Sequence, residues 1–158
     1  MLATYACLMP RPAPIGQWHH LGLGSFTVTG ATILVGTFLP WLHSGSRWRS
    51  SYDLFGLVQR LGFTEGGPIG LAVRAWPLVP LLVTVTVMLA WWRQTSLAVV
   101  SAVVVTAYTG GVAVALTVGA RRSPVDLGIG PWVCSIASIA FAVNAGVLVW
   151  TDRRRLTR

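Results

Sequence analysis

The amino-acid sequence predicts an all-α membrane protein with four antiparallel transmembrane helices and a short amphipathic interfacial helix between spans one and two. The first observation is composition: of 158 residues, 54% are hydrophobic and only 10% are charged, with a mean hydropathy of +0.66. About a quarter of the residues in a soluble domain are charged. The second observation is four apolar runs of the roughly 20 residues that cross a hydrocarbon core. Because no water reaches that core, each run must satisfy its backbone polar groups internally, as a helix.

The third observation is the placement of tryptophan. The indole ring combines a large apolar surface with one N–H donor, so it prefers the level of the lipid headgroups. The tryptophans that border the apolar runs are Trp41, Trp76, Trp91, Trp92, Trp132 and Trp150. This pattern indicates the two boundaries of a membrane slab.

Prolines and short polar stretches set the expected boundaries of the segments. Three prolines between residues 10 and 14 prevent a continuous helix there, which predicts a flexible tail. Pro40 falls near the end of span one, and Pro77 and Pro80 fall in the first turns of span two, where a missing donor matters least. Residues 94–96 leave only a tight turn before span three. The predicted segments are a tail at 1–20, a transmembrane domain at 21–151 with spans at about 24–42, 75–93, 97–118 and 131–150, an interfacial helix at about 50–61, and a basic tail at 152–158.

The segment between spans one and two contains its own helix signals. Ser50 and Asp53 resemble a capping box with Asp in place of Glu, and Gly62 suits a left-handed position after the last turn. Leucine and valine at positions 54, 57, 58 and 61 form an apolar stripe. A helix this short needs a surface on which to bury that stripe, which the membrane interface or the end of the bundle supplies.

Two roles stay open for this predicted interfacial helix. It either only seals the helix bundle, or it offers a recognition surface for anionic headgroups or a partner protein. The candidate lipid or partner contacts are Arg47, Trp48, Arg49, Tyr52, Asp53 and Arg60.

Residues 38–53 read FLPWLHSGSRWRSSYD. This stretch resembles the first-span exit of small, uncharacterised four-span membrane proteins of actinobacteria. In that group an LPW motif, a short Ser/Gly/Arg segment and an apolar helix precede three further spans, so the resemblance covers most of residues 25–150. It implies an inner-membrane protein of the cell envelope, and it supplies no catalytic or binding residues.

The net charge of +8 comes from twelve arginines and no lysine. These arginines flank the spans, where anionic headgroups are nearer than any nucleic acid, so we expect membrane lipids as partners and no nucleic acid. Four spans place both termini on one face, and each face then holds six arginines. The dense cluster directly after Trp150 breaks this tie and predicts a bacterial inner (plasma) membrane protein with both termini in the cytoplasm.

The predicted spans contain no acidic residue and no serine in a Gly-x-Ser-x-Gly motif. An ionisable group inside a membrane costs at least a few kcal/mol and is kept for a task, so we expect no proton relay and no catalytic residue. The three histidines fall on opposite faces of the slab, so we expect no metal site and no cofactor. Asn144 is the strongest polar group within a span. We expect it to bond to a neighbouring span, with a pore-lining or substrate-binding role as the alternative.

Small residues predict that spans three and four are in contact. They recur every four residues, which lets two helix backbones approach closely. The predicted ridges are Ala107, Gly111, Ala115 and Gly119 on span three, and Cys134, Ser138, Ala142 and Gly146 on span four. A second copy of the chain or a larger partner is the other surface that such a ridge can face.

These features favour a non-enzymatic integral membrane protein. We expect an accessory or scaffold subunit of a cell-envelope assembly, in contact with other membrane protein subunits or with itself. The alternative is a small transporter or permeation subunit that acts as an oligomer. A lipid-modifying enzyme is the third reading, and it lacks a recognisable nucleophile, base or metal cluster in this sequence.

Overall fold

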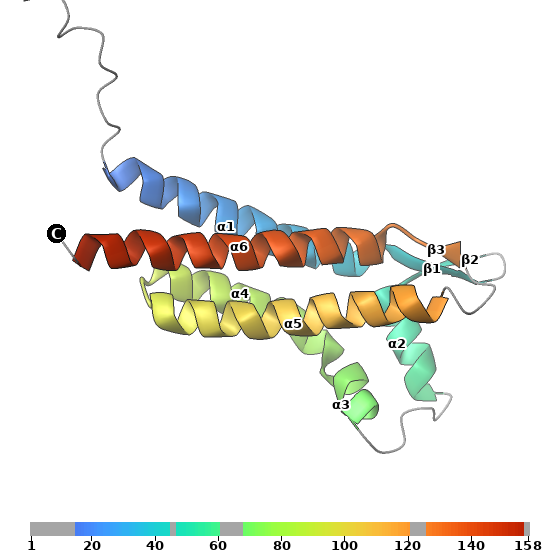
Figure 1. Ribbon diagram of the computed structural model, residues 1–158. Helices are drawn as coiled ribbons and strands as arrows, with labels where there is room; N and C mark the ends of the chain where they lie inside the picture. Colours follow the sequence, from blue (N-terminus) through green and yellow to red (C-terminus); the bar gives the residue numbers. More distant parts are fainter. Residues whose placement is uncertain (1–14, 45–46, 61–67, 121–125, 157–158) are drawn as a thin grey trace, which may run out of the picture.

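The computed structural model describes residues 15–44, 47–60, 68–120 and 126–156. Four long helices lie side by side in it: α1 (Ile15–Phe38), α4 (Val79–Trp91), α5 (Thr95–Ala120) and α6 (Gly130–Leu156) (Figure 1). Four segments are long and apolar enough to cross a membrane: His20–Phe38, Gly70–Trp91, Thr95–Ala120 and Gly130–Arg153. The chain is thus a predominantly helical protein with the four apolar helices of a multi-pass membrane protein.

The bundle has two distinct ends. At one end, called here the turn end, the start of α1 and the end of α6 lie near the turn between α4 and α5 (Figure 1). The other end, called here the capped end, carries the shorter elements. These are β1 (Pro40–Ser44), β2 (Arg47–Ser50), α2 (Ser51–Arg60), α3 (Pro68–Ala75) and β3 (Asp126–Leu127).

A small sheet at the capped end was not predicted and adds to the predominantly helical fold. Its strand order is β2-β1-β3, and β1 pairs antiparallel with both neighbours. Span one was predicted to reach residue 42, but α1 ends at Phe38 and residues 40–42 belong to β1. Pro40 explains the difference, because the residue before a proline is forced out of the helical region. Proline is then tolerated as the first residue of the strand.

The second apolar helix begins earlier than predicted and is interrupted. It was expected at 75–93, but helical structure starts at Pro68 in α3, and α4 follows after one 3-10 turn, η2 (Trp76–Leu78). Pro77 and Pro80 lie in the first turns of η2 and α4, as predicted for the start of a helix, but this start falls inside the apolar segment Gly70–Trp91. Each proline lacks a backbone donor and crowds the preceding turn, which bends a helix. In consequence α3 points away from the axis of α4 (Figure 1).

The turn end is tightly connected, as predicted from residues 94–96. Arg93 adopts a left-handed conformation with φ 61°, and the Gln94 N–H donates to the Leu89 carbonyl at 2.9 Å. The Thr95 hydroxyl donates to Asp152 of α6 at 2.8 Å. Both predicted tails are shorter than expected, because α1 already begins at Ile15 and α6 continues through Asp152 to Leu156.

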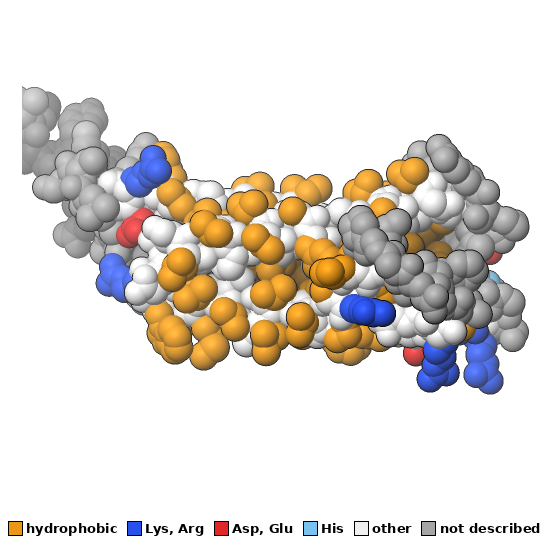
Figure 2. Space-filling model, turned by 90° about the horizontal axis from the view of Figure 1, so that it is seen from below, with side chains coloured by type: hydrophobic (Ala, Val, Ile, Leu, Met, Phe, Trp, Pro, Cys, Tyr) orange, Lys and Arg blue, Asp and Glu red, His pale blue; other side chains and the backbone are white. Residues whose placement is uncertain are grey.

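The tryptophan prediction holds for one group of indoles and is wrong for another. Trp91, Trp92, Trp132 and Trp150 are exposed near the helix ends, as the membrane-boundary interpretation requires. Trp41 and Trp76 are instead fully buried, with 0% of either side chain exposed. Apolar side chains cover the middle of the molecule and basic side chains gather at and near its two ends (Figure 2). The surface therefore has the banded character of a membrane protein.

Candidate binding pocket at the capped end

The capped end is held on the bundle by a buried aromatic cluster. The Trp41 and Trp76 rings meet edge to face at 5.4 Å, and Phe55 of α2 and Tyr108 of α5 lie 4.8 and 5.7 Å from Trp76. The Trp41 indole N–H donates to the Gly36 carbonyl at 2.8 Å. Buried aromatic pairs of this kind stabilise beyond the area that they bury. Strand β1, helix α2 and the η2 break are therefore fixed to one another.

One buried serine connects this cluster to α1. Ser51, the first residue of α2, accepts a hydrogen bond from the Trp76 indole N–H at 2.9 Å. Its hydroxyl donates in turn to the Thr37 carbonyl at 2.5 Å, in the last turn of α1. The serine satisfies a buried donor and a buried acceptor together, which anchors the start of α2.

The start of α2 forms the predicted capping box. The Ser50 hydroxyl donates to Asp53 Oδ2 at 2.8 Å, the Ser50 N–H donates to the same oxygen at 3.2 Å, and the Asp53 N–H donates back to Ser50 Oγ at 3.4 Å. The predicted apolar stripe is only partly correct. Leu54 packs on the core, but Leu57 is 39% exposed, and Phe55, which the stripe omitted, makes the ring contact with Trp76. Gly62 and Leu61 lie outside the described residues.

A pocket of about 450 Å³ lies between β2 and α2. Its lining residues are Arg47, Trp48, Arg49, Tyr52, Asp53, Gly56, Leu57 and Arg60. All six residues selected from the sequence as lipid or partner contacts are among them. Gly56 and Leu57 were not predicted as contacts; they follow Tyr52 and Asp53 by one helical turn.

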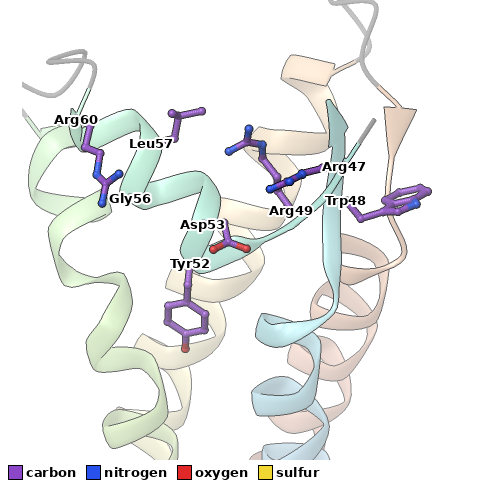
Figure 3. Close-up of a pocket in the computed structure, with 8 residues that line it drawn as sticks. All are labelled: Arg47, Trp48, Arg49, Tyr52, Asp53, Gly56, Leu57 and Arg60. Carbon is purple, nitrogen blue, oxygen red and sulfur yellow. The ribbon is translucent and has the colours of Figure 1, made fainter. Parts of the chain in front are cut away.

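The side chains lie unequally around this pocket (Figure 3). Arg47 and Arg49 extend from β2 toward α2, and Asp53 lies between the two elements. Arg60 lies farther away, at the end of α2. The Trp48 ring points to the other side of β2, where it lies 4.6 Å from the His43 ring of β1. The alternation of side chains along a strand explains why Trp48 diverges from its two arginine neighbours.

The pocket carries an excess of positive charge. Three guanidinium groups line it with a single carboxylate, that of Asp53. Within the described part of the chain, no ion pair joins these arginines to an acidic group. Arg49 Nε is buried and has no hydrogen-bond partner among the described residues. Because buried polar groups normally have a partner, a donor in this state is available to an acceptor that the described residues do not supply.

The pocket also borders the apolar belt. The Tyr52 ring lies 5.0 Å from the Phe38 ring of α1, and the Tyr52 and Thr37 hydroxyls are 3.4 Å apart. Phe38 is 65% exposed and ends the last turn of the first apolar helix. One side of the pocket is therefore basic, and the other side adjoins a surface of the kind that faces lipid.

The predicted ridge on α5 does not form the contact between α5 and α6. The two helices do pack together, but Ala107, Gly111 and Ala115 are exposed, as is Gly119. The buried face of α5 is instead Ala98, Ala102, Val105, Thr109 and Ala113, and the hydroxyls of Thr106 and Thr109 make its hydrogen bonds to Ser138 of α6. Small residues occupy both faces of α5, so their spacing could not tell the inner face from the outer one.

The predicted ridge residues of α6 lie in different environments. Ser138 is buried, and its hydroxyl lies 2.8 Å from that of Thr109 on α5. Cys134 is buried too, but it faces α1, where a Cβ on Gly36 would lie 2.6 Å from its sulfur. Ala142 is half-buried, and Gly146 is exposed with open space beside it. The four residues therefore do not form one continuous contact face.

Asn144 makes the hydrogen bonds to a neighbouring helix that were predicted for it. Its Oδ1 accepts from the Ser25 hydroxyl at 3.0 Å, and its Nδ2 donates to Thr29 Oγ1 at 3.5 Å. Both partners belong to α1. These contacts place Asn144 in the interface between the first and last helices.

Comparison with known proteins gave no match: no family model, no curated protein and no solved structure is significantly similar to this chain. The resemblance to actinobacterial four-span proteins accordingly stays a prediction.

Proposed function

We propose that this chain is a non-enzymatic accessory or scaffold subunit of a cell-envelope assembly in a bacterial plasma membrane. The observation that carries the proposal is the basic pocket at the capped end. Its two β2 arginines have no ion pair among the described residues, and its walls are fixed to the bundle through Ser51 and Trp76. A rigid, uncompensated basic site is suited to bind an anionic group on a partner or at the membrane surface.

The proposed topology has four antiparallel membrane crossings, with α2 as an interfacial helix on the outer side and both termini in the cytoplasm. It is supported by the position of the start of α1 and the end of α6 at the turn end (Figure 1) and by the four arginines that the sequence carries at residues 153–158. A reporter enzyme fused after Arg158 tests it. Activity of that reporter only on the outside of the membrane would overturn the orientation.

The exposed ridge of α5, defined as Ala107, Gly111, Ala115 and Gly119, supports a second contact of the same subunit. The opposite face of α5 packs inside the bundle, and a Cβ built on Gly111 meets nothing within 4 Å. Small residues on a lipid-facing helix let another helix approach its backbone closely. We propose that a helix of a second copy or of a larger assembly packs there.

The proposal is tested by purifying the tagged chain in a mild detergent and quantifying the membrane proteins that accompany it. We expect a defined set of partners, reduced by the triple change Arg47→Gln, Arg49→Gln and Arg60→Gln or by Gly111→Leu. The control is Arg93→Gln with Arg153→Gln, which removes charge only at the turn end. A single species of about 17.0 kDa, with no partner that responds to either change, would refute the scaffold role.

A further inference from the structure

The chemistry of the pocket identifies one class of ligand. We propose that the pocket at the capped end binds the phosphate of an anionic phospholipid headgroup. This inference rests on the proposed function, because it names the ligand of the same surface. It commits to a lipid as the source of the phosphate, ahead of a soluble anion or an acidic peptide.

The donors that face the pocket match phosphate oxygens. Arg47 and Arg49 extend side by side from β2 toward α2 (Figure 3), and a guanidinium group presents its N–H donors in a planar fork that fits phosphate. Arg49 Nε is buried without a partner among the described residues. A phosphate oxygen at this point would accept from that donor.

The single carboxylate of the pocket is already engaged. Asp53 Oδ2 accepts two hydrogen bonds from Ser50, one from its backbone N–H and one from its hydroxyl. This geometry holds Asp53 in the capping box of α2, where it stabilises the positive end of the helix. Three guanidinium groups against one carboxylate leave two positive charges in excess. A group that carries one or two negative charges would neutralise them.

The position of the pocket favours a lipid over a soluble ligand. Tyr52, in its lining, packs on Phe38 at 5.0 Å, and Phe38 is exposed at the end of a helix long and apolar enough to cross a membrane. Leu57 adds a partly exposed apolar side chain to the same lining. A headgroup bound at Arg47 and Arg49 would therefore have its acyl chains beside the apolar belt. A free phosphate or an acidic peptide would gain nothing from that contact.

The size of the pocket agrees with a headgroup. Its volume of about 450 Å³ lies within the range of about 300–1,000 Å³ that is typical of small-ligand sites. A bare phosphate ion would fill only part of this space. The phosphate together with a small polar substituent, such as glycerol, would fill more of it.

The test measures lipid binding to the purified full-length chain. Native mass spectrometry counts the lipids that the protein retains from detergent micelles supplied with phosphatidylglycerol, cardiolipin or phosphatidylcholine. The pocket variant is Arg47→Gln with Arg49→Gln. The matched control is Arg93→Gln with Arg153→Gln, which removes the same charge from the opposite end. A charge-retaining variant, Arg47→Lys with Arg49→Lys, and the thermal stability of every variant show whether a loss reflects charge or misfolding.

We expect preferential retention of the two anionic lipids, reduced by the pocket variant to a roughly thirtyfold weaker binding constant. The estimate follows because each basic residue near an anionic surface contributes the equivalent of about a fivefold change. The control variant should bind as the wild type does. The lysine variant keeps the charge but loses the guanidinium fork and the Arg49 Nε donor, so its affinity should fall between those of the wild type and the pocket variant. Equal retention of phosphatidylcholine, or equal losses in the pocket and control variants, would overturn the inference.

Three further outcomes test the source of the phosphate and separate the lipid inference from the proposed function. If soluble glycerol phosphate binds as tightly as phosphatidylglycerol, the lipid source is wrong even though the phosphate chemistry holds. If the pocket variant loses its partner proteins but keeps its lipid, the lipid inference fails and the scaffold role stands. If it loses lipid and keeps every partner, the lipid inference is supported and the pocket is not the scaffold contact.

Discussion

Replacement of Ser51 by alanine tests whether one buried hydroxyl anchors the capped end. The substitution leaves the Trp76 indole N–H without its acceptor and the Thr37 carbonyl without its donor, both in a fully buried setting. An orphaned buried polar group costs about 1–3 kcal/mol. We therefore expect the free energy of unfolding to fall by roughly 2–4 kcal/mol, which is a large part of the stability of a small domain.

The assay is reversible unfolding in mixed micelles, followed by tryptophan fluorescence, with Ser96→Ala as the control at an exposed position. A double-mutant cycle with Trp76→Phe separates the hydrogen bond from other effects of the serine. Because phenylalanine has no N–H to orphan, Ser51→Ala should cost less in the Trp76→Phe background, by about 1 kcal/mol or more. If Ser51→Ala is no more destabilising than Ser96→Ala, or if the two changes are additive, the anchoring argument is refuted.

Three other substitutions have definite expected outcomes. Gly130→Ala would place a Cβ 2.3 Å from Trp41 Cδ1, so the buried indole must move and the free energy of unfolding should fall by about 1–3 kcal/mol in the same assay. Gly111→Leu adds a side chain in open space and should leave stability within about 0.5 kcal/mol of wild type, while size-exclusion chromatography or co-purification shows weaker association. Asn144→Ala removes the bond to Ser25 and should cost only about 0.6 kcal/mol of unfolding free energy. A larger loss, or no loss at all, would contradict the interfacial role of this amide.

The four apolar helices could be predicted from the sequence because length and hydropathy are local properties. These segments have 19 to 26 residues, close to or above the roughly 20 that a hydrocarbon core requires, and the four helices found overlap the four runs expected. The capping box at Ser50 and Asp53 was equally local and was confirmed. The tight turn at Arg93 and Gln94 could likewise be predicted from the residues next to it in the sequence.

The predictions that were wrong concern features that depend on contacts between segments far apart in the sequence. Trp41 was assigned to the membrane boundary, but β1 pairs with β2 and with β3, more than 80 residues away, and this pairing brings the indole inward. The helix-breaking effect of Pro77 could be anticipated, but not that α3 would extend the segment on its other side. Spacing alone could not orient α5, since small residues line both of its faces.

The candidate contacts were chosen from their charge and their position between two spans, and the structure places all six around one pocket. Their role in binding stays a prediction. What the sequence could not indicate was the relation of this pocket to Phe38, because the Tyr52 contact depends on how α2 folds back over the end of α1. That contact places the pocket beside the exposed Phe38 ring, which is why we propose a lipid as its ligand.

The central position of α6 has a consequence for biosynthesis. The last helix of the chain packs against both α1 and α5, and it supplies Phe141, stacked on Phe26 at 4.3 Å, and Cys134, seated against Gly36. During translation α1 emerges first, yet its main neighbour is made more than a hundred residues later. The face of α1 at Gly36 therefore stays uncovered until α6 has been synthesised, so these contacts form only after the intervening helices have been made.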